Sequence, residues 1–244
     1  MSGDLSLLAM LAVFFFATFI RSAFGFGEAL VAVPLLALMM PIEVAAPVAV
    51  LVSITIAAIV VAQDWRDINF RSVGWLSIST LFGVPLGLFL LVAVDERLVQ
   101  AILAVVIIGF SAYCLRRQTL PSLKDDRLAP VFGFCAGVLG GAYGMNGPPL
   151  VIYGSLRGWS PQRFRATLQG YFLPASLMGM GGYWFAGLWT QTVTSHFIKT
   201  LPAVVIAVFL GRAVNRRLSG RSFIVYVHVS LLIVGSILFW QSVA

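Results

Sequence analysis

Two ionisable side chains lie close together in a mostly apolar, glycine-containing stretch, "RSAFGFGEAL" (21–30). The guanidinium of Arg21 is suited to bidentate recognition of an oxyanion. Glycines allow a sharp turn and leave backbone N–H groups open to a ligand. The stretch therefore predicts a site for a small anion. Its expected members are Arg21, Gly25, Phe26 and Gly27 for binding the anion, and Glu28 for coupling to protons.

Both charged residues also have plainer interpretations. Arg21 could extend its head to a membrane interface, as long basic side chains do. Glu28 could simply form an ion pair with Arg21. Because an ionised carboxylate beside the site would repel an anion, the two roles of Glu28 are linked through its protonation.

A second glycine-rich turn, "GGAYGMNGPPL" (140–150), resembles the first. "SAFGFGEALVAV" (22–33) aligns on "GAYGMNGPPLVI" (141–152) without gaps. A helix restarting near Pro148 would present its N-terminus, which favours anions. The residues expected to contribute are Tyr143, Gly144, Asn146 and Gly147, with Gln169 as a further neutral hydrogen-bonding group. Hydrogen bonding between helices is the alternative role for Tyr143, Asn146 and Gln169.

Ten helical segments are expected to position these turns. Their ranges are 5–22, 28–40, 42–63, 72–93, 98–116, 128–143, 147–157, 161–187, 194–213 and 222–242. Segments 28–40 and 147–157 would be only about 19 and 16 Å long, against a hydrocarbon core of about 30 Å. Gly133, Gly137 and Gly141 form a stripe of small residues that predicts close helix packing.

The composition is that of a polytopic membrane protein. Of 244 residues, 60% are hydrophobic and only 10% are charged, whereas soluble domains average about 25% charged residues. The net charge of +7 is carried in short gaps between apolar runs rather than on one soluble face. The lipid bilayer is therefore the expected partner, and nucleic acid is excluded. The sequence leaves a homodimer open.

The alignment of the two turns predicts two inverted-topology repeats of about five helical elements each, giving an all-α fold. We expect an N-terminal transmembrane repeat at 1–117, a cytoplasmic linker at 118–127 and a C-terminal repeat at 128–244. Inversion would bring the two turns together near the membrane midplane as short or re-entrant hairpins. Matching short segments interrupted by Gly or Pro are a sequence pointer to a transporter site.

Basic residues set the expected orientation. With the central linker in the cytoplasm, the gaps 64–71, 116–127, 158–165 and 212–221, with Arg157 at the edge of one, hold 13 of the 16 Lys and Arg residues. The positive-inside rule then places both termini outside the bacterial inner membrane. The 13 are Arg66, Arg71, Arg116, Arg117, Lys124, Arg127, Arg157, Arg163, Arg165, Arg212, Arg216, Arg217 and Arg221.

No cofactor, metal site or catalytic residue is expected. Cys114 and Cys135 lie in apolar segments without metal-ligand spacing. A secondary transporter for a small anion, working by alternating access, fits the pattern best. An anion channel with the same site remains an alternative. A more distant one is an intramembrane enzyme using Ser111 and His228.

At the two turns, "GFGEALVAVPLL" (25–36) and "GAYGMNGPPLVIY" (141–153), the sequence resembles the TauE/SafE family of anion transporters, often described as sulfite exporters. The total length, the two-half layout and the short basic central loop are also similar to that family. The resemblance implies transport of a small sulfur-containing or organic anion, such as sulfite or an organosulfonate.

Overall fold

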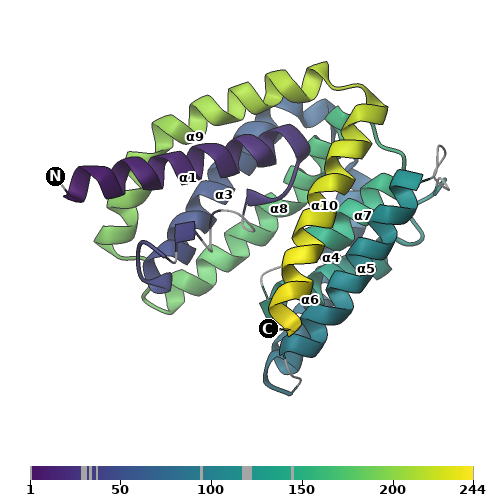
Figure 1. Cartoon of the computed structure of the whole chain (residues 1–244), viewed down its shortest axis with the longest axis horizontal. Helices are drawn as coiled ribbons and strands as arrows, with labels where there is room; N and C mark the ends of the chain where they lie inside the picture. Colours follow the sequence, from purple (N-terminus) through teal and green to yellow (C-terminus); the bar gives the residue numbers. More distant parts are fainter. Residues whose placement is uncertain are drawn as a thin grey trace. The chain divides into compact units, whose positions relative to one another are not determined.

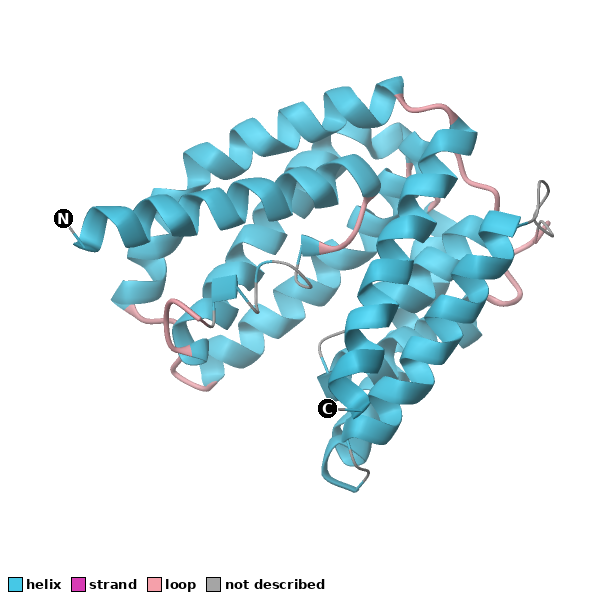
Figure 2. Ribbon diagram, viewed as in Figure 1, coloured by secondary structure: helices cyan, strands magenta, loops and turns pink. Residues whose placement is uncertain are grey.

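The computed structural model describes residues 2–28, 32, 35–36, 38–93, 96–116, 123–143 and 146–243. Every regular element within these residues is helical (Figure 2). The elements are α1 (Ser2–Phe24), α3 (Ile42–Asp64), the 3-10 turn η1 (Trp65–Asp67), α4 (Phe70–Ala93), α5 (Glu96–Arg116), α6 (Ala129–Tyr143), α7 (Gly147–Leu156), α8 (Pro161–Phe185), α9 (Gln191–Arg217) and α10 (Gly220–Val243). These elements confirm the expected helices, apart from 28–40, in which residues 29–31, 33, 34 and 37 lie outside the described residues.

Four of the described helices are long and apolar enough to cross a bilayer. Their apolar stretches are Leu7–Phe24, Glu43–Asp67, Gln191–Arg217 and Gly220–Ile237. Large apolar side chains such as Phe82, Phe185 and Trp240 are exposed on the surface, as is typical of helices that face lipid. In contrast, α7 has 10 residues and reaches only about 15 Å, so the prediction of a short element there is confirmed.

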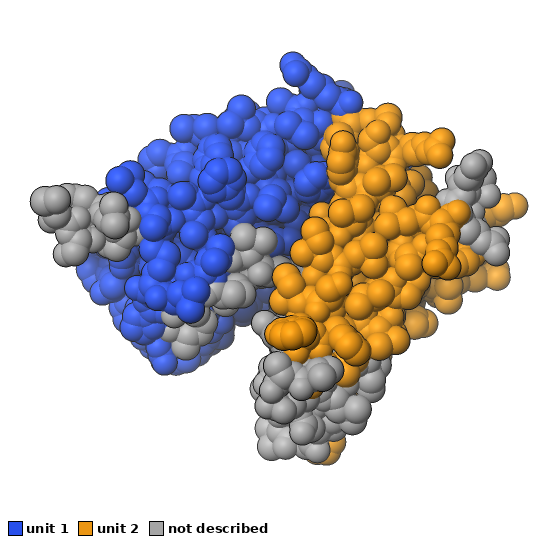
Figure 3. Space-filling model, viewed as in Figure 1, with its two compact units in different colours: residues 1–70, 162–217 blue, residues 71–161, 218–244 orange. Residues whose placement is uncertain are grey.

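The chain forms two compact units, and each takes helices from both halves of the sequence. Unit 1 comprises residues 1–70 and 162–217, and unit 2 comprises 71–161 and 218–244 (Figure 3). In unit 1, α1 lies along α9 (Figure 1). A Cβ on Gly211 of α9 would lie 2.5 Å from Cβ of Ser22. The absence of a side chain at this position is therefore what lets α1 and α9 approach so closely.

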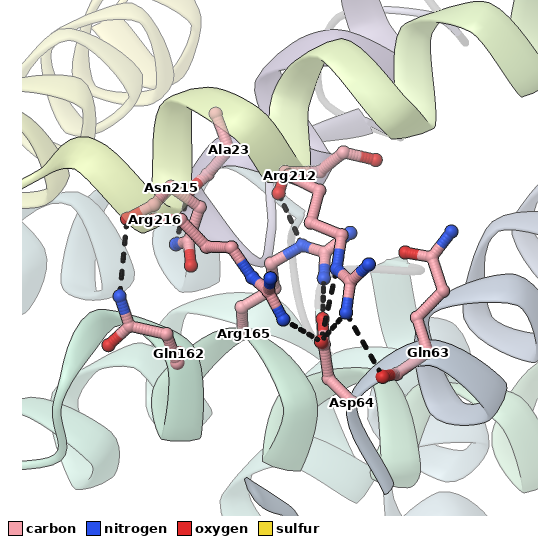
Figure 4. Close-up of polar contacts among 9 residues, drawn as sticks. Ala23, Gln63, Asp64, Gln162, Arg165, Arg212, Asn215 and Arg216 are labelled. Atoms are coloured by element: carbon pink, nitrogen blue, oxygen red, sulfur yellow. Dashed lines mark hydrogen bonds and ion pairs between the residues drawn. The ribbon is translucent and has the colours of Figure 1, made fainter.

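Ion pairs join the ends of three helices in unit 1. Asp64, at the end of α3, accepts hydrogen bonds from Arg165 near the start of α8 and from Arg212 in α9, the latter at 2.5 Å from Nη2 (Figure 4). Arg216 lies 3.5 Å from the same carboxylate. These residues come from three gaps that the charge pattern predicts on one side of the membrane, and the structure gathers them at one end of the unit.

Unit 2 contains the predicted glycine stripe, which packs against α4. A Cβ added at Gly133 would lie 2.5 Å from the carbonyl oxygen of Leu76, and one added at Gly141 would lie 2.6 Å from that of Val84. Gly137 faces Thr80 in the same way. Close packing of the helix that carries the stripe is thus confirmed. In the same unit, α5 lies along α10 (Figure 1).

Asp126, just before α6, is the polar centre of unit 2. Its carboxylate accepts hydrogen bonds from Ser72 at 2.6 Å and Tyr153 at 2.8 Å, and Arg157 lies 3.4 Å away. Burial alone would raise the pKa of Asp126. The hydrogen bonds from Ser72 and Tyr153 and the charges of Arg157 and Arg71 outweigh it, so the pKa lies below its ordinary value.

We expect Asp126→Asn to lower the free energy of unfolding by about 2 kcal/mol at pH 7, because it weakens hydrogen bonds to a charged group. A carboxyl with a lowered folded-state pKa stabilises the protein above its unfolded-state pKa of about 3.9, and this contribution is lost as pH falls through the folded-state value. The stabilities of wild type and variant should therefore converge in acid. Thermal unfolding of the purified protein between about pH 2 and pH 7.5 measures this, because the loss is expected only below about pH 4. A constant difference across the range would contradict it.

Candidate functional site

Arg21 is a buried arginine in the last turn of α1, with 5% of its surface exposed. Its Nε and Nη2 atoms donate hydrogen bonds to Oε1 of Gln169, at 3.0 and 2.8 Å. The structure thus brings together two predicted site residues that are 148 positions apart in the sequence. The guanidinium is therefore buried in the interior of unit 1 in this structure.

The turn after α1 is shaped by glycine. Gly25 and Gly27 have φ values of +91° and +100°, which other residues rarely adopt. A Cβ on Gly25 would also lie 3.2 Å from Cα of Arg165 in α8. Because α8 approaches so closely, Nε2 of Gln169 can donate to the carbonyl oxygen of Gly25 at 3.0 Å. Phe26 is 4% exposed and packs into the interior.

Glu28 is 2% exposed and forms an ion pair with Nη1 of Arg21. The pairing that the sequence left open is therefore present. Its Oε2 atom makes this contact, whereas Oε1 is buried without a hydrogen-bond partner among the described residues. An anion that binds the guanidinium must compete with this carboxylate, so protonation of Glu28 would favour anion binding.

Three further residues complete the surroundings of Arg21, and sequence reasoning missed them. Ser53 of α3 accepts a hydrogen bond from Nη1 at 2.6 Å and lies 2.8 Å from the hydroxyl of Ser176 in α8. The guanidinium carbon lies 5.0 Å from the ring centre of Phe172, which is a cation–π distance. The available signal was a hydroxyl within each of two long apolar helices, since polar groups inside membrane helices usually pair with one another.

The second predicted turn belongs to unit 2. Gly147 begins α7, and Pro148 and Pro149 occupy its first turn, where a missing N–H costs little. Asn146 is the N-cap residue, but its side chain makes no capping hydrogen bond. Tyr143 ends α6. Gly144 and the side chain of Tyr143 lie outside the described residues, and the roles of these four residues stay predictions.

The described part of the chain also bears on the Ser111–His228 alternative and on metal binding. The hydroxyl of Ser111 and both ring nitrogens of His228 have no hydrogen-bond partner there, so these two residues do not form a nucleophile–base pair. No group of three or more His, Cys, Asp or Glu side chains in the described residues could hold a metal ion.

Comparison with known proteins identifies the family. The model of the sulfite exporter TauE/SafE family matches residues 10–238. A probable sulfite/organosulfonate exporter TauE of Cupriavidus necator is 26% identical over 214 residues, which cover 85% of this chain and 84% of that protein. No solved structure gives a significant match. This multi-pass membrane protein is a transporter and not an enzyme, and it belongs to the TauE/SafE sulfite exporter family.

Proposed function

We propose that this protein is a secondary transporter for sulfite or an organosulfonate, and that the anion binds at Arg21. The observation that carries the proposal is the buried guanidinium held by Gln169 and Glu28 within unit 1. A charge in this position is costly and usually functional. The relative from Cupriavidus necator is described as a probable sulfite/organosulfonate exporter, which supports this class of anion.

In this proposal, an oxyanion replaces the carboxylate of Glu28 as the partner of Arg21. The guanidinium offers two parallel N–H groups to a planar or pyramidal oxyanion. Protonation of Glu28 removes the competing charge, so one proton is taken up for each anion bound. Release of that proton restores the ion pair and expels the anion. Gln169 keeps the guanidinium in place in both states.

We further propose two inverted repeats working by alternating access, with both termini outside the inner membrane. Two packing contacts support the repeat. In unit 1 the first predicted element, α1, packs against the ninth at Gly211, and in unit 2 the sixth element, α6, packs against the fourth along its glycine stripe. These pairs correspond when the second half is aligned on the first. The gathering of Asp64, Arg165 and Arg212 supports a shared side for their gaps.

Counterflow in proteoliposomes tests the proposal. Vesicles containing the purified protein and loaded with unlabelled sulfite are diluted into a trace of labelled sulfite. We expect transient accumulation of label that saturates with external sulfite, because a carrier exchanges one bound anion for another. Protein-free vesicles are the control. Label that only equilibrates would indicate an anion channel, and no flux with either sulfite or an organosulfonate would overturn the substrate class.

A further inference from the structure

The Asp64 cluster, made of Asp64, Arg165, Arg212 and Arg216, has more positive charge than its ion pairs require. Three guanidinium groups share one carboxylate (Figure 4), which leaves a net charge of +2. Arg165 is 1% exposed and Asp64 is 8% exposed. Arg212 and Arg216 are more exposed, at 23% and 57% of their side chains, so water screens part of the excess charge, and the remainder attracts a counter-anion to the cluster.

Hydrogen-bond donors without partners lie around the same residues. Nη2 of Arg165 is buried and donates no hydrogen bond within the described part of the chain. The side-chain amide of Gln63, which adjoins Asp64, is also buried without a partner, and so is the hydroxyl of Ser22. Ser22 is in contact with the cluster because its carbonyl oxygen accepts a hydrogen bond from Nε of Arg165 at 2.5 Å.

A purely structural role would need fewer positive charges. Asp64 and Arg165 alone connect α3 to α8, and Arg212 adds α9 through both the carboxylate and the carbonyl oxygen of Gln63. The third guanidinium, that of Arg216, makes only a 3.5 Å contact with the carboxylate. Its charge therefore adds little to the connection between the helices, but it does add to the attraction for an anion.

We propose that the Asp64 cluster is a second anion site, which takes a small dianionic oxyanion such as sulfite. A dianion would balance the net charge of +2, and Nη2 of Arg165 would donate to it. Arg165 precedes Gln169 by one helical turn in α8, a rise of about 6 Å. The second site therefore lies beside the Arg21 site within unit 1. The inference goes beyond the proposed function, since binding here does not require transport.

Equilibrium dialysis tests this site by measuring directly how much labelled sulfite the purified protein binds. The background is a double variant of the protein, Arg21→Gln with Glu28→Gln. This variant lacks the first site but has the same net charge as wild type. We expect saturable binding to persist in this background. Adding Arg165→Gln should weaken it about 10- to 100-fold, because hydrogen bonds to charged groups are lost. Adding Asp64→Asn should tighten it about tenfold, because the competing carboxylate becomes neutral.

The opposite signs of these two effects separate a binding site from a structural one. If the cluster only held helices together, both substitutions would weaken binding or leave it unchanged. Arg66→Gln is the matched control, since Arg66 is exposed at the same end of the unit and stacks on Trp65. No saturable binding in the background, or weaker binding in the Asp64→Asn variant, would overturn the second site. If wild type binds sulfite and the Arg21→Gln, Glu28→Gln double variant does not, the second site is wrong but the proposed function stands.

Discussion

Replacing Arg21 with Gln should lower the sulfite flux, measured as kcat/KM in proteoliposomes, by at least about 30-fold. The variant loses the charge and the paired N–H groups that hold an oxyanion. Removing one partner of a buried charged pair costs about 2–5 kcal/mol, and each 1.4 kcal/mol corresponds to a factor of ten. The saturable component of the flux should therefore disappear.

Two comparisons make this result specific to the site. Arg21→Lys keeps the charge but offers no planar pair of donors, so its flux should lie between those of wild type and Arg21→Gln. Arg66→Gln makes the same substitution at an exposed position and should transport like wild type. Monodisperse elution in detergent shows that each variant is folded. Normal flux through folded Arg21→Gln protein would show that the anion binds elsewhere.

Glu28→Gln should transport sulfite but no longer respond to a pH gradient. With one proton moved per anion, wild type can use about 1.4 kcal/mol from each pH unit. At a clamped membrane potential it should therefore hold about a tenfold concentration ratio of sulfite per pH unit. A neutral amide cannot exchange the proton, so the variant should only equilibrate the anion. The measurement is the steady-state ratio of labelled sulfite, after subtraction of protein-free vesicles.

Glu43→Gln is the matched control for this experiment, because Glu43 is an exposed acid in the first turn of α3. It should keep the full gradient response. An unchanged response in Glu28→Gln would assign the coupling to another group. A variant that also loses flux in the absence of a gradient would make the Arg21–Glu28 pair a structural element.

Most of the fold was predictable because membrane helices leave a strong signal in the sequence. The long apolar runs gave α3, α9 and α10 within a few residues, and the glycine spacing of α6 identified its packing face. What the sequence did not indicate is that each compact unit mixes helices from both halves. That arrangement depends on which apolar faces meet, and apolar residues are nearly interchangeable as packing partners.

The candidate site was predictable where a residue is chemically unusual for its surroundings. Arg21 and Glu28 stood out as charges in an apolar stretch, and the glycine turn between them gave the local shape. Gln169 was named as a neutral hydrogen-bonding group, although nothing in the sequence indicated its bonds to Arg21. Ser53 and Ser176 were missed, because a serine in a membrane helix often bonds to its own backbone and gives no distinctive pattern.

The makeup of unit 1 has a consequence for how the protein is made. Residues 162–217 complete this unit, so Gln169 and Ser176 are synthesised long after Arg21 has entered the membrane. An unpaired arginine within a membrane-inserted segment is costly, and Arg21 lies in the last turn of α1. Glu28, only seven residues along the chain, can neutralise Arg21 during this interval. We therefore expect the ion pair to lower the cost of inserting Arg21 before residues 162–217 are synthesised.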